Sequence, residues 1–161
     1  MRRTLALALL VAGCGRAVPD AAPSGGAAME RAARDRGLVT ADAKATATGV
    51  FRSGTDTVCM VTDGGDFRLG ASVDYGEGQR CVVRAKARGG ATLSIDAGGG
   101  CRLEARVDAD RLAFPAVVPS ACDAFCTGRA SLSALEGARL SDSASEASRV
   151  RGADGRLLCG S

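Results

Sequence analysis

Residues 67–107 alternate between apolar and polar side chains with a period of two, and this constrains the fold more than any other feature. Such alternation is typical of β-strands with one buried face. Short glycine-rich runs between the strands indicate hairpin turns. The expected inward side chains are Phe67, Leu69, Ala71, Val73, Tyr75, Cys81, Val83, Ala85, Ala87, Leu93, Ile95, Ala97, Cys101, Leu103, Ala105, Val107, Leu112 and Phe114. The pattern predicts a mainly β domain, built as a small antiparallel meander or barrel.

The same parity predicts the register of three hairpins, because an inward residue must face an inward residue across each turn. Exposed pairs of opposite charge then fall opposite one another, which contributes a few tenths of a kcal/mol. The expected pairs are Asp74 with Arg80, Lys86 with Thr92, Ala85 with Leu93, Ile95 with Leu103, and Asp96 with Arg102.

The chain has seven cysteines, of which Cys14 stands apart near the N-terminus. Without Cys14, six cysteines remain. An even number of cysteines in an exported domain predicts a disulfide framework, here with 15 possible connectivities. Each bridge contributes roughly 2–4 kcal/mol, largely by restricting the unfolded chain. The six cysteines of the framework are Cys59, Cys81, Cys101, Cys122, Cys126 and Cys159.

The N-terminal segment has the profile of a secretory signal: two arginines precede an apolar run over 4–12, which is shorter than the roughly 20 residues that span a bilayer. Val11-Ala12-Gly13-Cys14 resembles the bacterial lipobox. The resemblance implies a signal peptide over 1–13 and a palmitate-bearing lipid anchor on Cys14. Gly15 in the following position implies the outer membrane, with the protein facing the periplasm. The alternative is an ordinary signal peptide with a chance cysteine.

Residues 14–47 are predicted to form a lipid-anchored flexible tether, because 15–28 are rich in Ala, Gly, Ser and Pro. Within the tether, 28–37 allow either a short helix or a partly ordered extension, and the extension is favoured. The disulfide-rich β domain is then expected over 48–161, with its C-terminal third covering the apolar face of the meander.

Two short helices are expected in that C-terminal third. The first spans 121–126, with Ser120 as its N-cap, and would place Cys122 and Cys126 on one face. The second starts at Ser143 and ends before Gly152. A last strand over 155–160 would bring Cys159 back to the domain.

The charge balance argues against nucleic acid as a partner. Of the 21 Lys and Arg, two leave with the signal, so 19 face 18 Asp and Glu and the net charge becomes +1. The chain also has one Tyr, four Phe and no Trp, so it lacks stacking side chains for nucleic acid or carbohydrate.

No catalytic residue, metal site or cofactor site is predicted. The chain contains no His, which removes Ser–His and Cys–His nucleophile pairs and His-containing zinc sites. Ser131, Ser133 and Ser141 have no base to activate them. Cys122 and Cys126 are interpreted as structural half-cystines, each bridged elsewhere, with a redox pair as the alternative.

Six cations are predicted to share the outer face of the meander. Their possible role is to bind anionic lipid headgroups or a carboxylate-rich partner. The favoured interpretation is a solvated face, because Asp74, Asp96, Glu104 and Asp108 lie among them. The six are Arg68, Arg80, Arg84, Lys86, Arg102 and Arg106.

The domain resembles the small lipoproteins of Gram-negative envelopes. Over 48–115 it is also loosely similar to the lipoprotein inhibitors of lysozyme and of secreted proteases, which are small β-barrels. The sequence therefore predicts a non-enzymatic outer-membrane lipoprotein that binds an envelope protein partner or plays a structural role. The alternatives are a periplasmic thiol–disulfide protein using Cys122 and Cys126, and an inhibitor of a hydrolase.

Overall fold

The computed structural model describes residues 25–36 and 47–160. The predicted signal peptide, Cys14 and most of the predicted tether therefore lie outside the described residues. Within the tether, α1 (Gly25–Asp35) is a regular helix. The partly ordered extension favoured from the sequence is thus wrong here, because the alanines of this segment have a high helix propensity.

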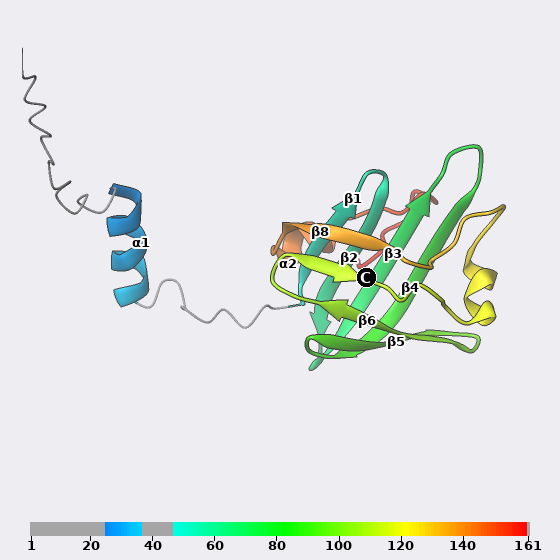
Figure 1. Cartoon of the computed structure of the whole chain (residues 1–161), viewed down its shortest axis with the longest axis horizontal. Coiled ribbons are helices and arrows are strands. Elements are labelled where there is room, and N and C mark those ends of the chain that lie inside the picture. The colour runs from blue at the N-terminus through cyan, green and yellow to red at the C-terminus, as the bar shows by residue number, and fades with distance from the viewer. Residues whose placement is uncertain (1–24, 37–46, 161) are drawn as a thin grey trace, which may run out of the picture. The chain divides into compact units, whose positions relative to one another are not determined.

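Eight antiparallel strands form a closed barrel, in which each strand pairs with its neighbours in sequence and β8 pairs back with β1. Figure 1 shows this barrel, with the loop that precedes β8 at its right-hand end. The predicted mainly β fold is confirmed. The strands are β1 (Gly49–Ser53), β2 (Asp56–Asp63), β3 (Asp66–Asp74), β4 (Arg80–Gly89), β5 (Thr92–Gly98), β6 (Cys101–Val107), β7 (Arg111–Ala113) and β8 (Glu136–Ser141).

The predicted inward side chains form the core of the barrel, together with Phe51, Val58 and Met60 from β1 and β2. Phe67, Ala85 and Ala97 are only partly buried but pack against this core. Tyr75 is the exception: it lies just beyond β3 and is 57% exposed. The chain has entered the turn at this point, where the Tyr75 N–H donates to the Gln79 carbonyl at 2.9 Å.

The register is confirmed in two hairpins and wrong in the third. Asp74 faces Arg80, Ile95 faces Leu103, and Asp96 faces Arg102. Between β4 and β5, however, Lys86 pairs with Asp96 instead of Thr92, and Leu93 pairs with Gly89 instead of Ala85. The pairing is shifted by four residues because β4 continues through Gly89 and the turn is made by 90–92. An even shift keeps every side chain on its predicted face.

The loop between β7 and β8 seals one end of the barrel, which we call the sealed end. It contains the 3-10 helix η1 (Ser120–Phe125), and it buries Leu132 and Leu135 against the core. The helix was predicted, but the predicted N-cap, Ser120, is wrong: Pro119 occupies the N-cap position and makes no side-chain bond. Disulfides Cys101–Cys122 and Cys81–Cys126 fix this loop to β6 and β4.

The C-terminal arm, residues 142–160, packs on the outside of the barrel. Its helix α2 (Ala144–Ala147) starts as predicted, since the Ser143 hydroxyl accepts from the Glu146 N–H, but it ends well before Gly152. The predicted last strand is reduced to a single bridge between Arg151 and Leu157. The sheet closes on itself, so this arm covers the outer surface of the barrel and not the open inner face that was expected.

The C-terminal arm builds a second, smaller apolar cluster on the outer surface. Leu158 and Cys159 pack there with Val50 and Val61, and the cluster contains the disulfide Cys59–Cys159. Leu158 lies directly against Gly70 of β3: a Cβ added to Gly70 would lie 2.6 Å from the Leu158 Cβ. This glycine therefore sets how closely the arm approaches the barrel.

We expect Gly70→Ala to lower the free energy of unfolding by about 1–3 kcal/mol, the usual cost of overpacking. The matched control is Gly90→Ala, because a Cβ at Gly90 would meet nothing within 4 Å; it should stay within about 0.5 kcal/mol of the wild type. Urea unfolding measures both. Equal stabilities of the two variants would contradict the close packing of the arm on β3.

Candidate binding cleft

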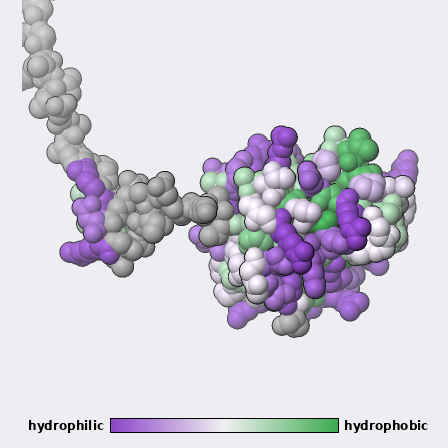
Figure 2. Space-filling view, turned by 90° about the horizontal axis from the view of Figure 1, so that it is seen from below, coloured by the Kyte–Doolittle hydropathy of each residue, from purple (hydrophilic) through white to green (hydrophobic). Residues whose placement is uncertain are grey.

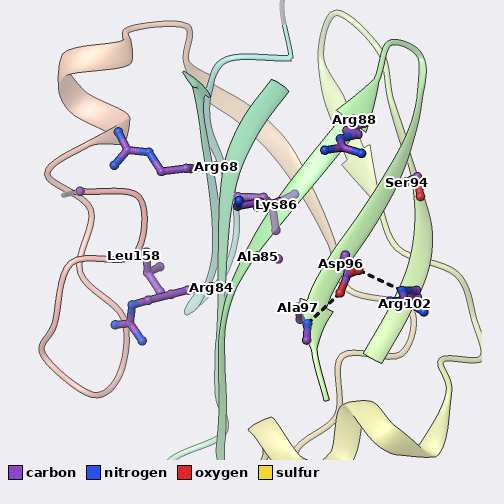
Figure 3. Close-up of a pocket in the computed structure, with 13 residues that line it drawn as sticks. Arg68, Arg84, Ala85, Lys86, Arg88, Ser94, Asp96, Ala97, Arg102 and Leu158 are labelled. Carbon is purple, nitrogen blue, oxygen red and sulfur yellow. Dashed lines mark hydrogen bonds and ion pairs between the residues drawn. The ribbon is translucent and has the colours of Figure 1, made fainter. Parts of the chain in front are cut away.

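An open cleft of about 600 Å³ lies on the outer surface of the barrel, between the C-terminal arm and the β5–β6 hairpin. Figure 3 shows it with β3 and β4 at its centre. Its floor is apolar and includes Leu69, Ala85 and Ala97, and Leu158 of the arm forms part of one wall. We call it the basic cleft because its rim carries five cations: Arg68, Arg84, Lys86, Arg88 and Arg102.

Four of the six cations predicted to share a binding face thus line one cleft. The other two do not: the Arg80 guanidinium bonds the Ala153 carbonyl at 3.4 Å, and Arg106 lines a separate groove beside Phe114. Arg88 was not predicted, because the expected pairing of Lys86 with Thr92 leaves it in the turn between the two strands. Its outward position in β4 would have followed from extending the alternation by one step.

Four of the five cations of the basic cleft are held by carboxylates. Arg84 binds Asp154 at 3.0 Å, and Arg88 binds Asp66 at 2.8 Å. The remaining two pairs are Arg102 with Asp96 at 2.9 Å and Arg68 with Asp63 at 3.7 Å. These partly exposed pairs contribute little to stability. The three shorter pairs orient the guanidinium groups of Arg84, Arg88 and Arg102, whereas the buried Arg68 Nε makes no hydrogen bond within the described residues.

Lys86 differs from the other four, because no carboxylate of the described residues pairs with it. It lies directly opposite Arg68 across the β3–β4 ladder, and Arg84 is two residues away on the same strand face. In Figure 3 the three side chains extend from the same side of β3 and β4. Like charges in directly opposed positions destabilise a sheet. On the other side of Lys86, Asp96 lies opposite it across the β4–β5 ladder, but the Asp96 carboxylate binds Arg102, so a bound anion would give Lys86 a partner of its own.

Two carboxyl groups beside the basic cleft, those of Asp96 and Asp154, have a lowered pKa. A hydrogen bond from the Arg102 guanidinium, followed by one from the Gly98 N–H, lowers the pKa of Asp96. At Asp154, desolvation is the largest single effect and opposes the shift, but hydrogen bonds from the Arg156 N–H and the Arg84 guanidinium outweigh it and lower the pKa. The same contacts with Asp96 raise the pKa of Arg102.

The arm wall of the basic cleft depends on two kinds of contact. Arg84 joins the arm to β4, since its Nε donates to the Leu157 carbonyl at 2.7 Å while the same guanidinium binds Asp154. The disulfide Cys59–Cys159, with a Cα–Cα distance of 6.1 Å, fixes the end of the arm to β2. Both cysteines are buried.

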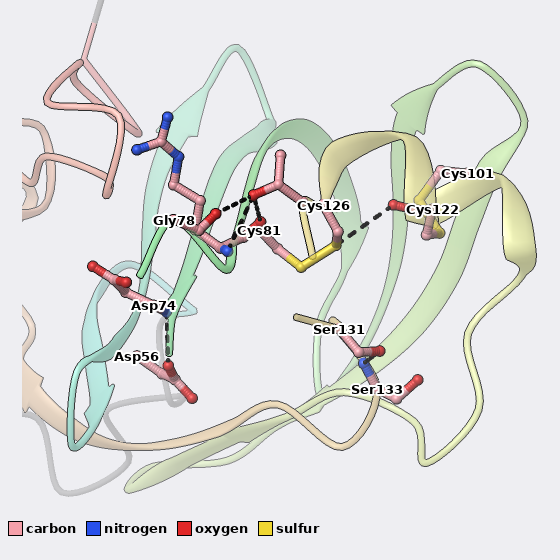
Figure 4. The surroundings of a disulfide bond; sticks show 11 residues. Asp56, Asp74, Gly78, Cys81, Cys101, Cys122, Cys126, Ser131 and Ser133 are labelled. Carbon is pink, nitrogen blue, oxygen red and sulfur yellow. Dashed lines mark hydrogen bonds between the residues drawn. A yellow bond between two sulfur atoms is a disulfide. The ribbon is translucent and has the colours of Figure 1, made fainter. Parts of the chain in front are cut away.

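The predicted cysteine framework is confirmed, and Cys122 and Cys126 are bridged to different strands. Figure 4 shows the disulfide Cys81–Cys126, with Cys101–Cys122 nearby. Cys122 is buried and Cys126 is half-buried. The two half-cystines of the CxxxC sequence are therefore not partners of each other.

Two of the three serines considered from the sequence accept local hydrogen bonds from the main chain. The Ser131 hydroxyl accepts from the Ser133 N–H at 3.0 Å, and the Ser141 hydroxyl accepts from the Ser143 N–H at 3.1 Å, so both stabilise turns. Across residues 25–36 and 47–160, no group of three or more Cys, Asp and Glu is placed to hold a metal ion.

One interacting pair of aspartates was not predicted from the sequence. The Asp74 N–H donates to the Asp56 carboxylate at 3.3 Å where β2 begins and β3 ends (Figure 4). Burial, and to a lesser extent the charge of Asp74, raises the pKa of Asp56, although the Asp74 N–H opposes the shift. The two residues are 18 positions apart, so the pairing follows from the register and leaves no local signal in the sequence.

A second cavity of about 800 Å³ opens at the end of the barrel opposite the sealed end. Its lining is mostly small or apolar and includes Ala47, Phe67 and Val107. Beside it, the Arg139 guanidinium donates to the Thr48 carbonyl at 2.8 Å and the Asp108 carbonyl at 3.3 Å. This arginine ties the start of the domain to the β6–β7 turn.

Comparison of the chain with protein-family models, with curated proteins and with solved structures finds no match. No helix of the described segments is long and apolar enough to cross a membrane.

Replacing both Cys59 and Cys159 by Ser should lower the free energy of unfolding by about 2–5 kcal/mol. It should also free the arm wall, so that amide hydrogen exchange of 156–160 becomes faster while β6 and η1 stay protected. The control is Cys81→Ser with Cys126→Ser, which should loosen the sealed end and leave the arm protected. An arm that remained protected without its disulfide would show that Arg84 and Leu158 suffice to hold it.

Asp154→Asn should reduce stability at neutral pH by about 0.2–1 kcal/mol, the range of exposed ion pairs. Because folding lowers the pKa of Asp154, its contribution is complete above the unfolded value of 3.8 and is lost as the pH falls through the folded pKa. The difference in unfolding free energy between wild type and variant should therefore shrink only below about pH 4. A difference that is constant down to pH 2 would contradict this assignment.

Proposed function

We propose that this protein is a non-enzymatic outer-membrane lipoprotein, anchored through Cys14, whose β-barrel binds an acidic segment of an envelope protein partner in the basic cleft. The observation that carries the proposal is the position of Lys86, which faces Arg68 across the ladder and forms no ion pair with a carboxylate of the described residues. The lipid anchor rests on the lipobox-like sequence alone.

The shape of the basic cleft supports a binding role. An apolar floor surrounded by charged side chains is the usual composition of a recognition site, in which burial supplies affinity and charge supplies specificity. Asp66, Asp96 and Asp154 hold their partner arginines in place, which lowers the entropic cost of binding. Lys86 remains available for an incoming carboxylate.

The disulfide arrangement favours this role over thiol–disulfide exchange. Exchange requires an exposed, reactive sulfur. The bridges that contain Cys122 and Cys126 instead hold the loop that seals the barrel, and their partners Cys81 and Cys101 are buried. We therefore assign these bridges a structural role.

The test is photo-crosslinking in intact cells from a crosslinker placed at Ser94, which lines the basic cleft. We expect a discrete protein adduct, reduced at least about fivefold by Lys86→Glu because a charge is reversed at the centre of the interface. A crosslinker at Ser145, exposed on α2 away from the cleft, is the matched control and should not form that adduct.

Two outcomes would overturn the proposal. One is an adduct that forms equally from Ser94 and Ser145, or that is unaffected by Lys86→Glu. The other is an adduct with phospholipid from Ser94, which would identify the basic cleft as a surface for anionic lipid headgroups.

A further inference from the structure

The basic cleft lies where the ladder between β4 and β5 is interrupted. The last pair of this ladder toward the sealed end is Lys86 with Asp96. Farther along β4, the next segment on this side is the loop between β7 and β8. It pairs with β4 no farther than Cys81, which forms an isolated β-bridge with Cys126. Residues 82–85 of β4 therefore have no strand paired with them on the side of β5.

The main chain of Arg84 faces this interruption. Strand main-chain groups point alternately to the two neighbouring strands. The Thr127 N–H donates to the Arg80 carbonyl at 2.8 Å from the β5 side, and the Gly90 N–H donates to Thr92 across the β4–β5 turn. Even-numbered residues of β4 thus direct their N–H and C=O toward β5, and Arg84 is one of them.

The residue that would pair with Arg84 does not do so. Continuing the register places Gly98 opposite Arg84, but the Gly98 N–H donates instead to the Asp96 carboxylate at 2.9 Å. Figure 3 shows Ala85 and Ala97 on either side of the interruption, with the Asp96 contacts at its edge. Both alanines line the basic cleft and are partly exposed. Their small side chains leave room between the two strands.

We propose that the acidic segment of the partner binds in extended conformation as a short added strand along residues 82–85 of β4. This inference rests on the proposed function and names the way in which the partner binds. Main-chain hydrogen bonds to Arg84 fix the register, as in other complexes formed by strand addition. The available edge is four residues long, or about 13 Å, so the segment is short.

Alternation along the added strand defines its sequence. Side chains that point outward meet Arg84, Lys86 and Arg68, so these positions are acidic. Side chains that point inward meet Ala85 and Ala97, so these positions are small. The expected ligand is an extended segment in which acidic and small residues alternate.

Two probes test this inference on the folded protein. The first is the peptide acetyl-Glu-Ala-Glu-Ala-Glu-amide, and the second is the same peptide with the nitrogens of all five residues methylated, which keeps the charge but removes the main-chain donors for either strand orientation. We expect the first to shift the amide resonance of Arg84 in a nitrogen–proton correlation spectrum. Methylation should weaken binding at least about tenfold, and Lys86→Ala should weaken binding of the first peptide.

The outcomes separate this inference from the function on which it rests. Equal binding of the two peptides at the basic cleft would overturn strand addition and leave the acidic partner in place. If the first peptide does not bind at millimolar concentration although crosslinking from Ser94 succeeds, the alternating acidic strand is wrong. Failure of both experiments would overturn the proposed function itself.

A measurement without any ligand tests the exposed edge directly. The Arg84 amide should exchange with solvent at least about tenfold faster than the amides of Val83 and Ala85, whose main chains face β3. Equal protection of the three amides would show that the edge is not open and would overturn the inference.

Discussion

The pairing of β8 with β1 is the contact on which the rest of this structure depends. Without this pairing, β1 and β8 would be the exposed edge strands of an open meander. With it, the two strands cover each other and the sheet is a closed barrel. Phe51 faces Arg139 across this seam, and the guanidinium lies 4.5 Å from the centre of the ring. Gly137 allows the close approach, since a Cβ there would lie 2.8 Å from the Arg52 nitrogen. With the seam formed, the apolar positions of all strands share one interior.

The three disulfides supply stability that a bigger domain would obtain from a larger hydrophobic core. Two of them hold the loop that closes the sealed end, and their chain separations are 45 and 21 residues. The third, with a separation of 100 residues, holds the C-terminal arm outside the barrel. The disulfides therefore cross-link the barrel to the loop at its sealed end and to the arm on its outer surface. The arm that the third disulfide fixes is also a wall of the basic cleft, so the stability of the fold and the shape of the cleft depend on the same covalent bond.

The sequence predicted the strands between residues 67 and 114 and their faces because side-chain parity is a local property. It did not single out β1, β2 or β8. It also predicted the start of α2, where Ser143 and the Glu146 N–H are three residues apart. It missed the four-residue shift between β4 and β5, because any even shift satisfies the same parity. In the predicted register, β5 would have covered β4 as far as Arg80. In the actual register, β5 ends opposite Arg84, and this shift creates the interruption in the barrel wall.

The sequence by itself determined what each short segment could be: alternating strands, a set of six cysteines, and a row of outward cations. These depend on neighbours two to four residues apart. Only the tertiary structure decided which cysteines meet, that β8 closes the sheet, and which four of the predicted cations surround one cleft. Those outcomes depend on chain segments tens of residues apart, whose meeting is set by the packing of the whole barrel and leaves no periodic trace in the sequence.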